Sequence, residues 1–296
     1  MTRFFVFIFS ILSFHLSMAQ ANDITFYCDV MVNAFDAKHR IQAEEKFASL
    51  FEQELSQPAS FSKDFKDLKW VSIKKPTDNS FRIITWQVKG LNDVYAYKGV
   101  IQTKEGSLFR LDDHSQEMAG INFEVLNPDD WFGALYYNMI EAGEGEDKYY
   151  ILFGFNGWNE QTHKKVIEVL HFEKGMPKFG KNIFLTNDIK DGNHAQTRVI
   201  IEYDGNANVN CNYNEGMKMI VYDYVTTRAG FGPGEEHKKV PDGTYVAYEP
   251  KGSKWQKIDQ LATKVQTNED IFYKPKDKEV GAKKDIFGRP AKSKGR

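Results

Sequence analysis

The sequence predicts a mainly β protein. We expect an antiparallel meander that curls into a barrel or propeller-like arrangement or folds over as a sandwich, with one N-terminal helix. Short apolar or alternating stretches separated by Gly- and Asn-containing turns follow residue 81, whereas a 3.6-residue apolar period occurs only before it. Strand and helix patterns do not alternate, which argues against a parallel α/β sheet. About a dozen strands would be too many for one flat open sheet, so the meander should close or fold over.

The chain begins with the pattern of a secretory signal peptide. Arg3 precedes an apolar run over residues 4–14, and small residues follow at Ala19 and Ala21. A run of about eleven residues is too short to span a bilayer, and no later stretch approaches the roughly 18 apolar residues of a membrane span. We therefore expect cleavage near Ala19 or Ala21, a periplasmic or secreted location, and no transmembrane anchor.

Residues 36–56 carry the one clear helix pattern. The apolar residues of one face follow the helical period: Ile41, Ala48, Phe51 and Leu55. Asp36 is the expected N-cap, and Pro58 ends the run.

Strand patterns extend from residue 81 to residue 258. The expected strands are 81–88, 94–102, 134–141, 149–156, 166–172, 198–203, 217–225, 243–249 and 254–258. Asp204-Gly205 suits a two-residue hairpin turn, after which Ala207, Val209, Cys211 and Tyr213 alternate with asparagines. We therefore predict a hairpin in which 207–213 returns along 198–203, with its apolar side chains inward.

These patterns divide the chain into four parts. They are a signal peptide (1–19), an N-terminal helical segment packed on the body (20–75), an antiparallel β domain (76–273) and a basic disordered tail (274–296). The tail holds nine Lys/Arg and three Asp/Glu, a net charge of +6, so the first 273 residues carry −8 of the total −2. An acidic body argues against nucleic acid as the partner.

The sequence contains no recognisable catalytic motif. It lacks a G-x-S-x-G elbow, an H-E-x-x-H pair and a phosphate-binding loop, so we predict no catalytic residue, no metal ligand and no cofactor. Asp204 to Glu215 places oxygen donors at an EF-hand-like spacing, but Val209 stands where such a loop needs glycine, so a hairpin is expected. Asp112–His114 and Asp188–His194 are interpreted as solvated loops, because neither has a ligand spacing.

Aromatic residues supply the remaining candidate for a binding site. Aromatic faces flanked by amides can stack on sugars, although a large β core also needs many aromatic side chains. The candidate ligand-binding residues are Trp131, Asn156, Trp158 and Asn159. Trp158, in an Asn-Gly-Trp-Asn loop, is expected to be the most exposed.

Two cysteines, Cys28 and Cys211, are too few for a disulfide framework. An oxidising compartment would permit one bridge between them. The apolar alternation around Cys211 suits a buried free thiol equally well, so the sequence leaves both states open.

Three parts of the chain resemble uncharacterised exported proteins of Bacteroidota-type bacteria. They are 81–86 with 97–102, 133–137 through 164–170, and 198–203 through 220–223. The resemblance covers most of residues 36–260 and implies a bacterial exported protein, but it transfers no activity and no site residue.

We therefore expect a non-enzymatic β-domain protein of the bacterial envelope that binds a glycan, a peptide or a partner protein. The alternative is a periplasmic or secreted hydrolase whose site is assembled from loop residues, because function depends on the site and not on the fold.

Overall fold

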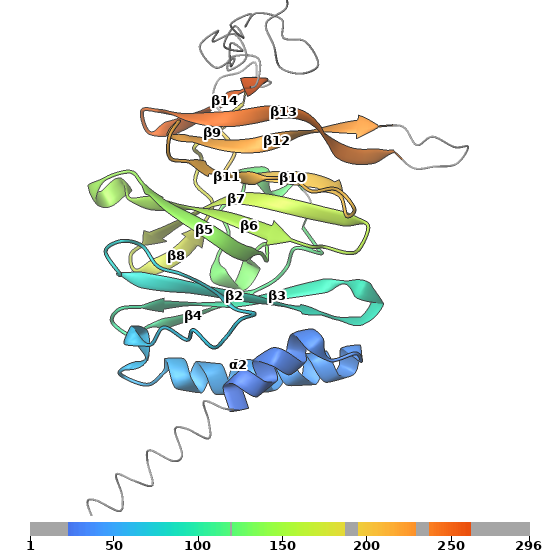
Figure 1. Ribbon diagram of the computed structural model, residues 1–296. Coiled ribbons are helices and arrows are strands. Elements are labelled where there is room, and N and C mark those ends of the chain that lie inside the picture. The colour runs from blue at the N-terminus through green and yellow to red at the C-terminus, as the bar shows by residue number, and fades with distance from the viewer. Residues whose placement is uncertain (1–22, 119, 187–194, 229–236, 262–296) are drawn as a thin grey trace, which may run out of the picture.

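The protein stacks one helical layer and three β-sheets in the order of the chain (Figure 1). The computed structural model describes residues 23–118, 120–186, 195–228 and 237–261. The sheets are antiparallel except for the pairing of β14 with β9, so the mainly β fold class is confirmed. No closed barrel is found in the described part of the chain, and the barrel and propeller alternatives are not confirmed.

The helical layer contains two helices, 23–33 and α2 (Ala37–Leu55). The predicted cap of α2 is confirmed, because Asp36 Oδ1 accepts a hydrogen bond of 2.8 Å from the Lys38 amide. Phe47 and Phe51 of α2 pack on Trp86 of the first sheet, with ring centroids 5.3 and 6.3 Å apart. In the described residues, no helix combines the length and the apolar character needed to cross a membrane.

The first helix corrects the expectation of a single N-terminal helix. Ile24, Cys28 and Met31 are all buried, and their spacing of four and three residues places them on one helical face. The pattern is short and directly follows the leader-like segment, residues 1–19 with the signal-peptide pattern. A separate helix was therefore not predicted from the sequence.

The first sheet has the strand order β1-β2-β3-β4. Its strands are β1 (Ser72–Lys74), β2 (Phe81–Lys89), β3 (Tyr95–Thr103) and β4 (Leu108–Asp112), with the short 3₁₀ turns η1 (Ser60–Ser62) and η2 (Leu91–Asp93) beside them. Alternate residues face opposite layers: Ile84 and Val100 pack against the helices, and Ile83 and Ile101 against the second sheet.

The second sheet has the order β10-β7-β6-β5, and β8 pairs with β7 beside this path. Its strands are β5 (Leu135–Ala142), β6 (Tyr149–Asn156), β7 (Thr162–Glu173), β8 (Met176–Phe179) and β10 (Arg198–Asp204). The 3₁₀ turns η3 (Ile121–Phe123) and η4 (Pro128–Asp130) lie in the connection from the first sheet, and η5 (Gly145–Asp147) joins β5 to β6.

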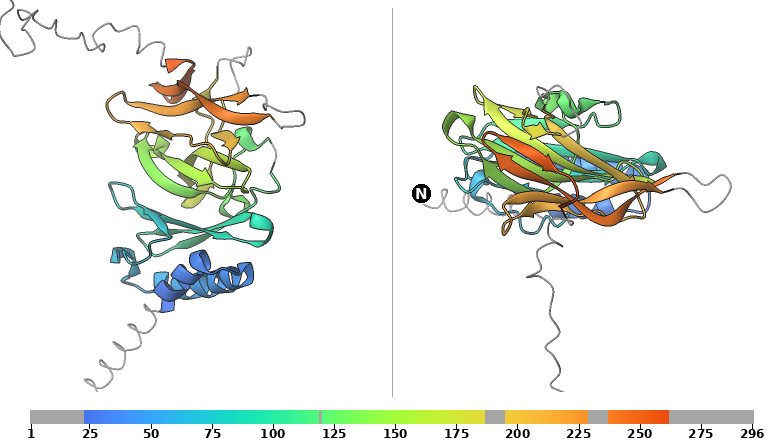
Figure 2. Two further views of the ribbon diagram at one scale, coloured as in Figure 1. Left: turned by 45° about the vertical axis from the view of Figure 1, so that its right-hand side comes forward. Right: turned by 90° about the horizontal axis from the view of Figure 1, so that it is seen from above.

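The third sheet has the order β11-β12-β13-β14-β9. Its strands are β9 (Phe184–Leu185), β11 (Cys211–Asn214), β12 (Met219–Arg228), β13 (Lys238–Lys251) and β14 (Lys254–Ile258). One end of the β12–β13 pair extends beyond the stack as a two-stranded ribbon, which is clear from above (Figure 2).

The predicted hairpin between 198–203 and 207–213 is wrong. β10 pairs with β7 of the second sheet, whereas β11 pairs with β12 of the third. The Gly205 amide donates to the Gln161 carbonyl (2.8 Å), so the Asp204–Gly205 corner leads the chain from one sheet to the next. The inward alternation is confirmed, because Val209 and Cys211 are buried in the core between these two sheets.

A buried ion pair lies inside the second sheet. Arg198 Nε donates to Glu168 Oε1 at 2.8 Å, and both side chains are fully buried. Glu168 Oε2 accepts from the Tyr136 hydroxyl (2.5 Å), which in turn accepts from Trp131 Nε1 (2.8 Å). The Arg198 guanidinium also donates to the carbonyl oxygens of Ile121, Glu124 and Phe179. The network therefore fastens the connection before η4 to the second sheet.

Both cysteines are buried and free. Cys28 lies in the core between the helices and the first sheet, and Cys211 lies in the core between the second and third sheets. Burial raises the pKa of the Cys28 thiol to about 11 and that of Cys211 to about 12. A whole sheet-to-sheet core separates them, which excludes the bridge that the sequence left open.

Candidate functional site

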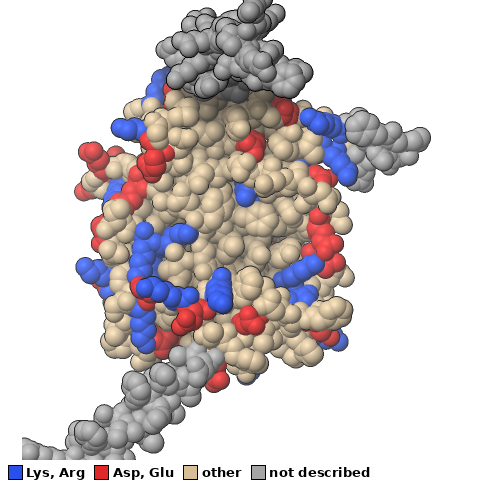
Figure 3. Space-filling model, viewed as in Figure 1, with Lys and Arg blue, Asp and Glu red and all other residues tan. Residues whose placement is uncertain are grey.

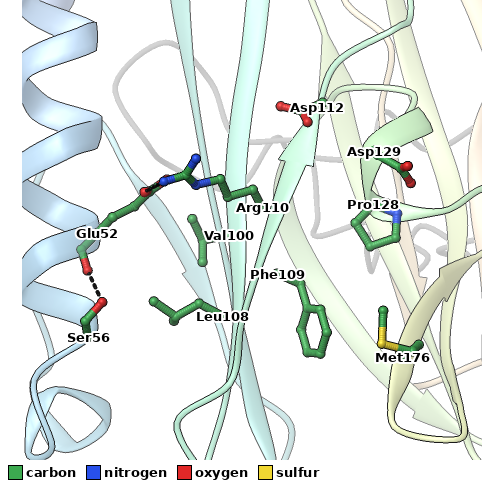
Figure 4. A pocket seen from close by; sticks show the side chains of 10 residues that line it. All are labelled: Glu52, Ser56, Val100, Leu108, Phe109, Arg110, Asp112, Pro128, Asp129 and Met176. Carbon is green, nitrogen blue, oxygen red and sulfur yellow. Dashed lines mark hydrogen bonds and ion pairs between the residues drawn. The ribbon is translucent and has the colours of Figure 1, made fainter.

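A hollow of about 580 Å³ lies along the outer edge of β4 (Figure 4). It is bordered by α2, the edge strand itself, η4 and the start of β8. The lining residues are Glu52, Ser56, Val100, Leu108, Phe109, Arg110, Asp112, Pro128, Asp129 and Met176.

No strand of the described residues pairs with the outer edge of β4, which is the last strand of its sheet. The Thr103 amide donates to the Ser107 carbonyl (2.9 Å), and the register continues with Ile101 opposite Phe109. Because backbone groups alternate between the two edges of a strand, those of the even-numbered residues face away from β3. His114 shows this directly, since its amide donates outward to the Trp131 carbonyl (2.9 Å). An isolated parallel bridge joins Asp113 to Trp131 at this end of the edge, and the remaining outward amides belong to Leu108, Arg110 and Asp112.

The hollow surrounds this edge on two sides (Figure 4). Leu108 packs with the core beneath the helices, and Phe109 packs with the core between the first two sheets. On the second side, Pro128 and Met176 lie across from Phe109, and Met176 is 49% exposed. An extended segment beside β4 would therefore contact protein on both of its faces.

Charged side chains line one side and one end of the hollow. Arg110 forms an ion pair with Glu52 of α2, and the Ser56 hydroxyl donates to the Glu52 carbonyl at 2.8 Å. Asp112 and Asp129 are exposed, and neither forms an ion pair with a described residue. The lining thus holds three carboxylates against one guanidinium.

Asp113 anchors the end of the edge strand, which corrects its interpretation as part of a solvated loop. Its carboxylate accepts hydrogen bonds from the amides of Tyr97 (2.9 Å) and Ser115 (2.8 Å). Burial raises the pKa of Asp113. Gly133 packs so closely that a Cβ there would lie 2.2 Å from Asp113 Oδ1. The edge strand is therefore held in place at its C-terminal end.

Trp131 and Asn156, two of the predicted ligand-binding residues, are fully buried. Trp131 belongs to the network around Glu168. The Asn156 amide group donates to the Gly133 carbonyl and accepts from the Trp158 amide, both at 2.8 Å. Their contacts are internal, and burial leaves neither side chain a face for a ligand.

Trp158 and Asn159, the other two predicted residues, form the turn between β6 and β7. Trp158 is half-buried, and Lys164 Nζ lies 3.1 Å from its ring centroid. Burial lowers the pKa of Lys164. Asn159 Oδ1 accepts from the amides of Gln161 (2.9 Å) and Thr162 (2.8 Å). The four predicted residues thus do not meet around one open site.

A second hollow, of about 460 Å³, lies beside this turn and is mainly polar. Its charges are paired within the chain: Lys239 contacts Glu202 at 2.8 Å, and Lys238 lies 4.0 Å from Asp204. The hollow at β4 differs because Asp112 and Asp129 form no ion pair, and the outer edge of the strand pairs with no strand, within the part of the chain that the structure describes.

The described residues hold no group of three or more His, Cys, Asp or Glu side chains that could bind a metal ion. Asp188–His194 lies outside the described residues.

Sequence reasoning missed β4 and the residues around it. The available signal was the Thr-Lys-Glu-Gly turn at 103–106 followed by a short stretch with Leu108, Phe109 and Leu111. Glu52, Pro128 and Met176 carry no local signal, because only the stacking of layers brings them to one strand edge.

No protein-family model matches the chain, and no curated protein or solved structure matches it significantly.

Proposed function

We propose that this chain is an exported, non-enzymatic protein of the bacterial envelope that binds an extended segment of a partner protein along β4. The observation that carries the proposal is the outer edge of β4, with which no strand of the described residues pairs and which lies in a hollow with protein on both sides. Strand addition uses such an edge: main-chain hydrogen bonds give affinity, and pockets for alternate side chains give specificity.

The charge distribution supports a protein partner. On the face in Figure 3, Lys and Arg gather at the lower left with Asp and Glu beside them, Asp and Glu line much of the right edge, and the upper middle carries few charged residues. A polyanion partner would be favoured by a continuous basic stripe, whereas an extended peptide needs backbone groups and side-chain pockets.

Export is proposed from the leader-like segment, which lies outside the described residues. Mass spectrometry of protein from periplasmic and culture fractions should show a mature chain that begins at Gln20 or Asn22. An intact Met1 in those fractions would contradict export with cleavage.

Binding at β4 can be tested by panning a phage library of random nonapeptides against the mature chain. Arg110→Pro removes an outward amide and leaves the bonds to β3, so enrichment should fall at least tenfold. Arg110→Ala keeps the amide and is the matched control that should still enrich peptides.

Hydrogen exchange of the wild-type chain provides a readout that does not depend on the folding of the proline variant. A bound peptide should slow exchange at Leu108, Arg110 and Asp112. Protection confined to another strand, or equal enrichment by Arg110→Pro in its folded form, would refute binding at this edge.

A further inference from the structure

A strand added to β4 would meet two different surroundings, because its side chains alternate between the faces of the sheet. We call this added strand the guest. Its side chain beside Phe109 would face the second sheet, and the side chains before and after it would face α2. The two sides of the hollow therefore select for different properties of the guest.

The side toward the second sheet is apolar. Phe109 is half-buried, Pro128 lies beside it, and Met176 is 49% exposed. An aliphatic guest side chain at this position would cover all three groups, whereas a polar one would lose hydration without gaining a hydrogen-bond partner.

The end of the hollow near Asp112 is acidic. Glu52 and Arg110 form an ion pair, which leaves Asp112 and Asp129 as the two carboxylates of the lining without an ion pair to a described residue; Lys98 of β3 lies opposite Asp112 in the register. Asp112 belongs to β4 on the α2 side, and Asp129 follows Pro128 on the other side (Figure 4). A basic side chain of the added strand two residues from the apolar one would lie on the side of Asp129. One three residues away would lie on the side of Asp112.

We infer that the partner segment presents an aliphatic side chain with a basic side chain two or three residues away, an inference that rests on the proposed function. Charged residues on an edge strand such as β4 commonly prevent it from pairing with another chain. Here the acidic excess would repel acidic segments and admit basic ones, so the same residues would also set specificity.

The test uses fluorescent, terminally blocked nonapeptides with Thr at all unspecified positions. The parent peptide has Ile at position five and Lys at positions three and seven, so that a Lys lies toward Asp129 whichever way the peptide runs. One matched peptide replaces Ile with Ser, and another replaces both Lys with Glu. Anisotropy titrations against the full-length mature chain measure affinity in 20 mM and 500 mM NaCl.

The parent peptide should bind about fivefold more tightly than the Glu peptide in 20 mM NaCl, because exposed ion pairs contribute modestly. This ratio should shrink in 500 mM NaCl and fall below about twofold in Asp112→Asn/Asp129→Asn, which should still bind both peptides. The Ser peptide should bind at least tenfold more weakly than the parent.

The outcomes separate the two claims. Equal affinity for all three peptides would overturn the inferred chemistry and leave binding at β4 intact. No binding by any peptide at millimolar concentration, together with a library that enriches nothing, would refute the proposed function itself. A synthetic peptide of residues 274–296 that protects β4 and binds more tightly than the parent would overturn the partner-protein inference in favour of the chain's own basic segment.

Discussion

Arg198→Met tests whether the buried ion pair of the second sheet supports the fold. The substitution removes the guanidinium that donates to Glu168 Oε1 at 2.8 Å and to three carbonyl oxygens, and it leaves a fully buried carboxylate without its cation. Breaking one side of a buried pair costs about 3–5 kcal/mol. Because a whole domain is stabilised by only about 5–15 kcal/mol, the variant should lose a large share of its stability.

A double variant separates the unpaired charge from the lost packing. Glu168→Gln keeps an acceptor for the Tyr136 hydroxyl but carries no charge, so Arg198→Met/Glu168→Gln should be about 1–2 kcal/mol more stable than Arg198→Met. Urea unfolding followed by circular dichroism, with an unchanged m-value, gives the free energies of unfolding of both variants. The exposed ion pair between Arg110 and Glu52 provides the control, since Arg110→Met should change the free energy of unfolding by less than about 1 kcal/mol.

Two results would refute this reasoning. A loss below about 1 kcal/mol for Arg198→Met would show that the pair contributes no more than an exposed one. A double variant no more stable than the single would show that the cost comes from packing and the carbonyl groups, and not from the unpaired carboxylate.

Three further predictions concern burial and backbone geometry. Burial raises the pKa of Glu44 above its ordinary 4.5, so its ionisation opposes folding. The free energy of unfolding should therefore fall as pH rises from about 4.5 through the raised pKa, and urea midpoints between pH 4 and 8 should show a flatter profile for Glu44→Gln; parallel profiles would contradict this. Gly133→Ala should destabilise by about 2–4 kcal/mol, because φ is +67° and a Cβ would meet Asp113, whereas Gly106→Ala, with open space at φ +99°, should cost only about 1 kcal/mol. Denatured, unreduced protein should show two labelled thiols, Cys28 and Cys211, and labelling of neither would restore the bridge.

Local patterns in the sequence were sufficient for most individual elements. The capped helix from Asp36, the strand expected over 81–88 and the inward alternation through Val209 and Cys211 all correspond to the structure. Each depends on interactions within a few residues, or on a period that assigns side chains to one face whatever lies opposite.

The sequence could not determine which sheet receives a strand. Asp204-Gly205 has the composition of a hairpin turn, yet its backbone bonds to Gln161 and directs β11 to the third sheet. Likewise, Trp131 was a candidate for ligand binding but lies in a buried network. It donates to the Tyr136 hydroxyl, which in turn donates to Glu168, 37 positions from Trp131 along the chain.

The candidate site depends wholly on tertiary structure. An edge is open when no other strand pairs with it. A hollow forms when layers meet without filling the space between them. The sequence by itself determined which residues of each strand share a face, because side-chain direction is a local property of the backbone. Only the stacking of α2, β4, η4 and β8 decided that Glu52, Phe109 and Met176 would surround one strand edge, because such contacts depend on how separate layers pack.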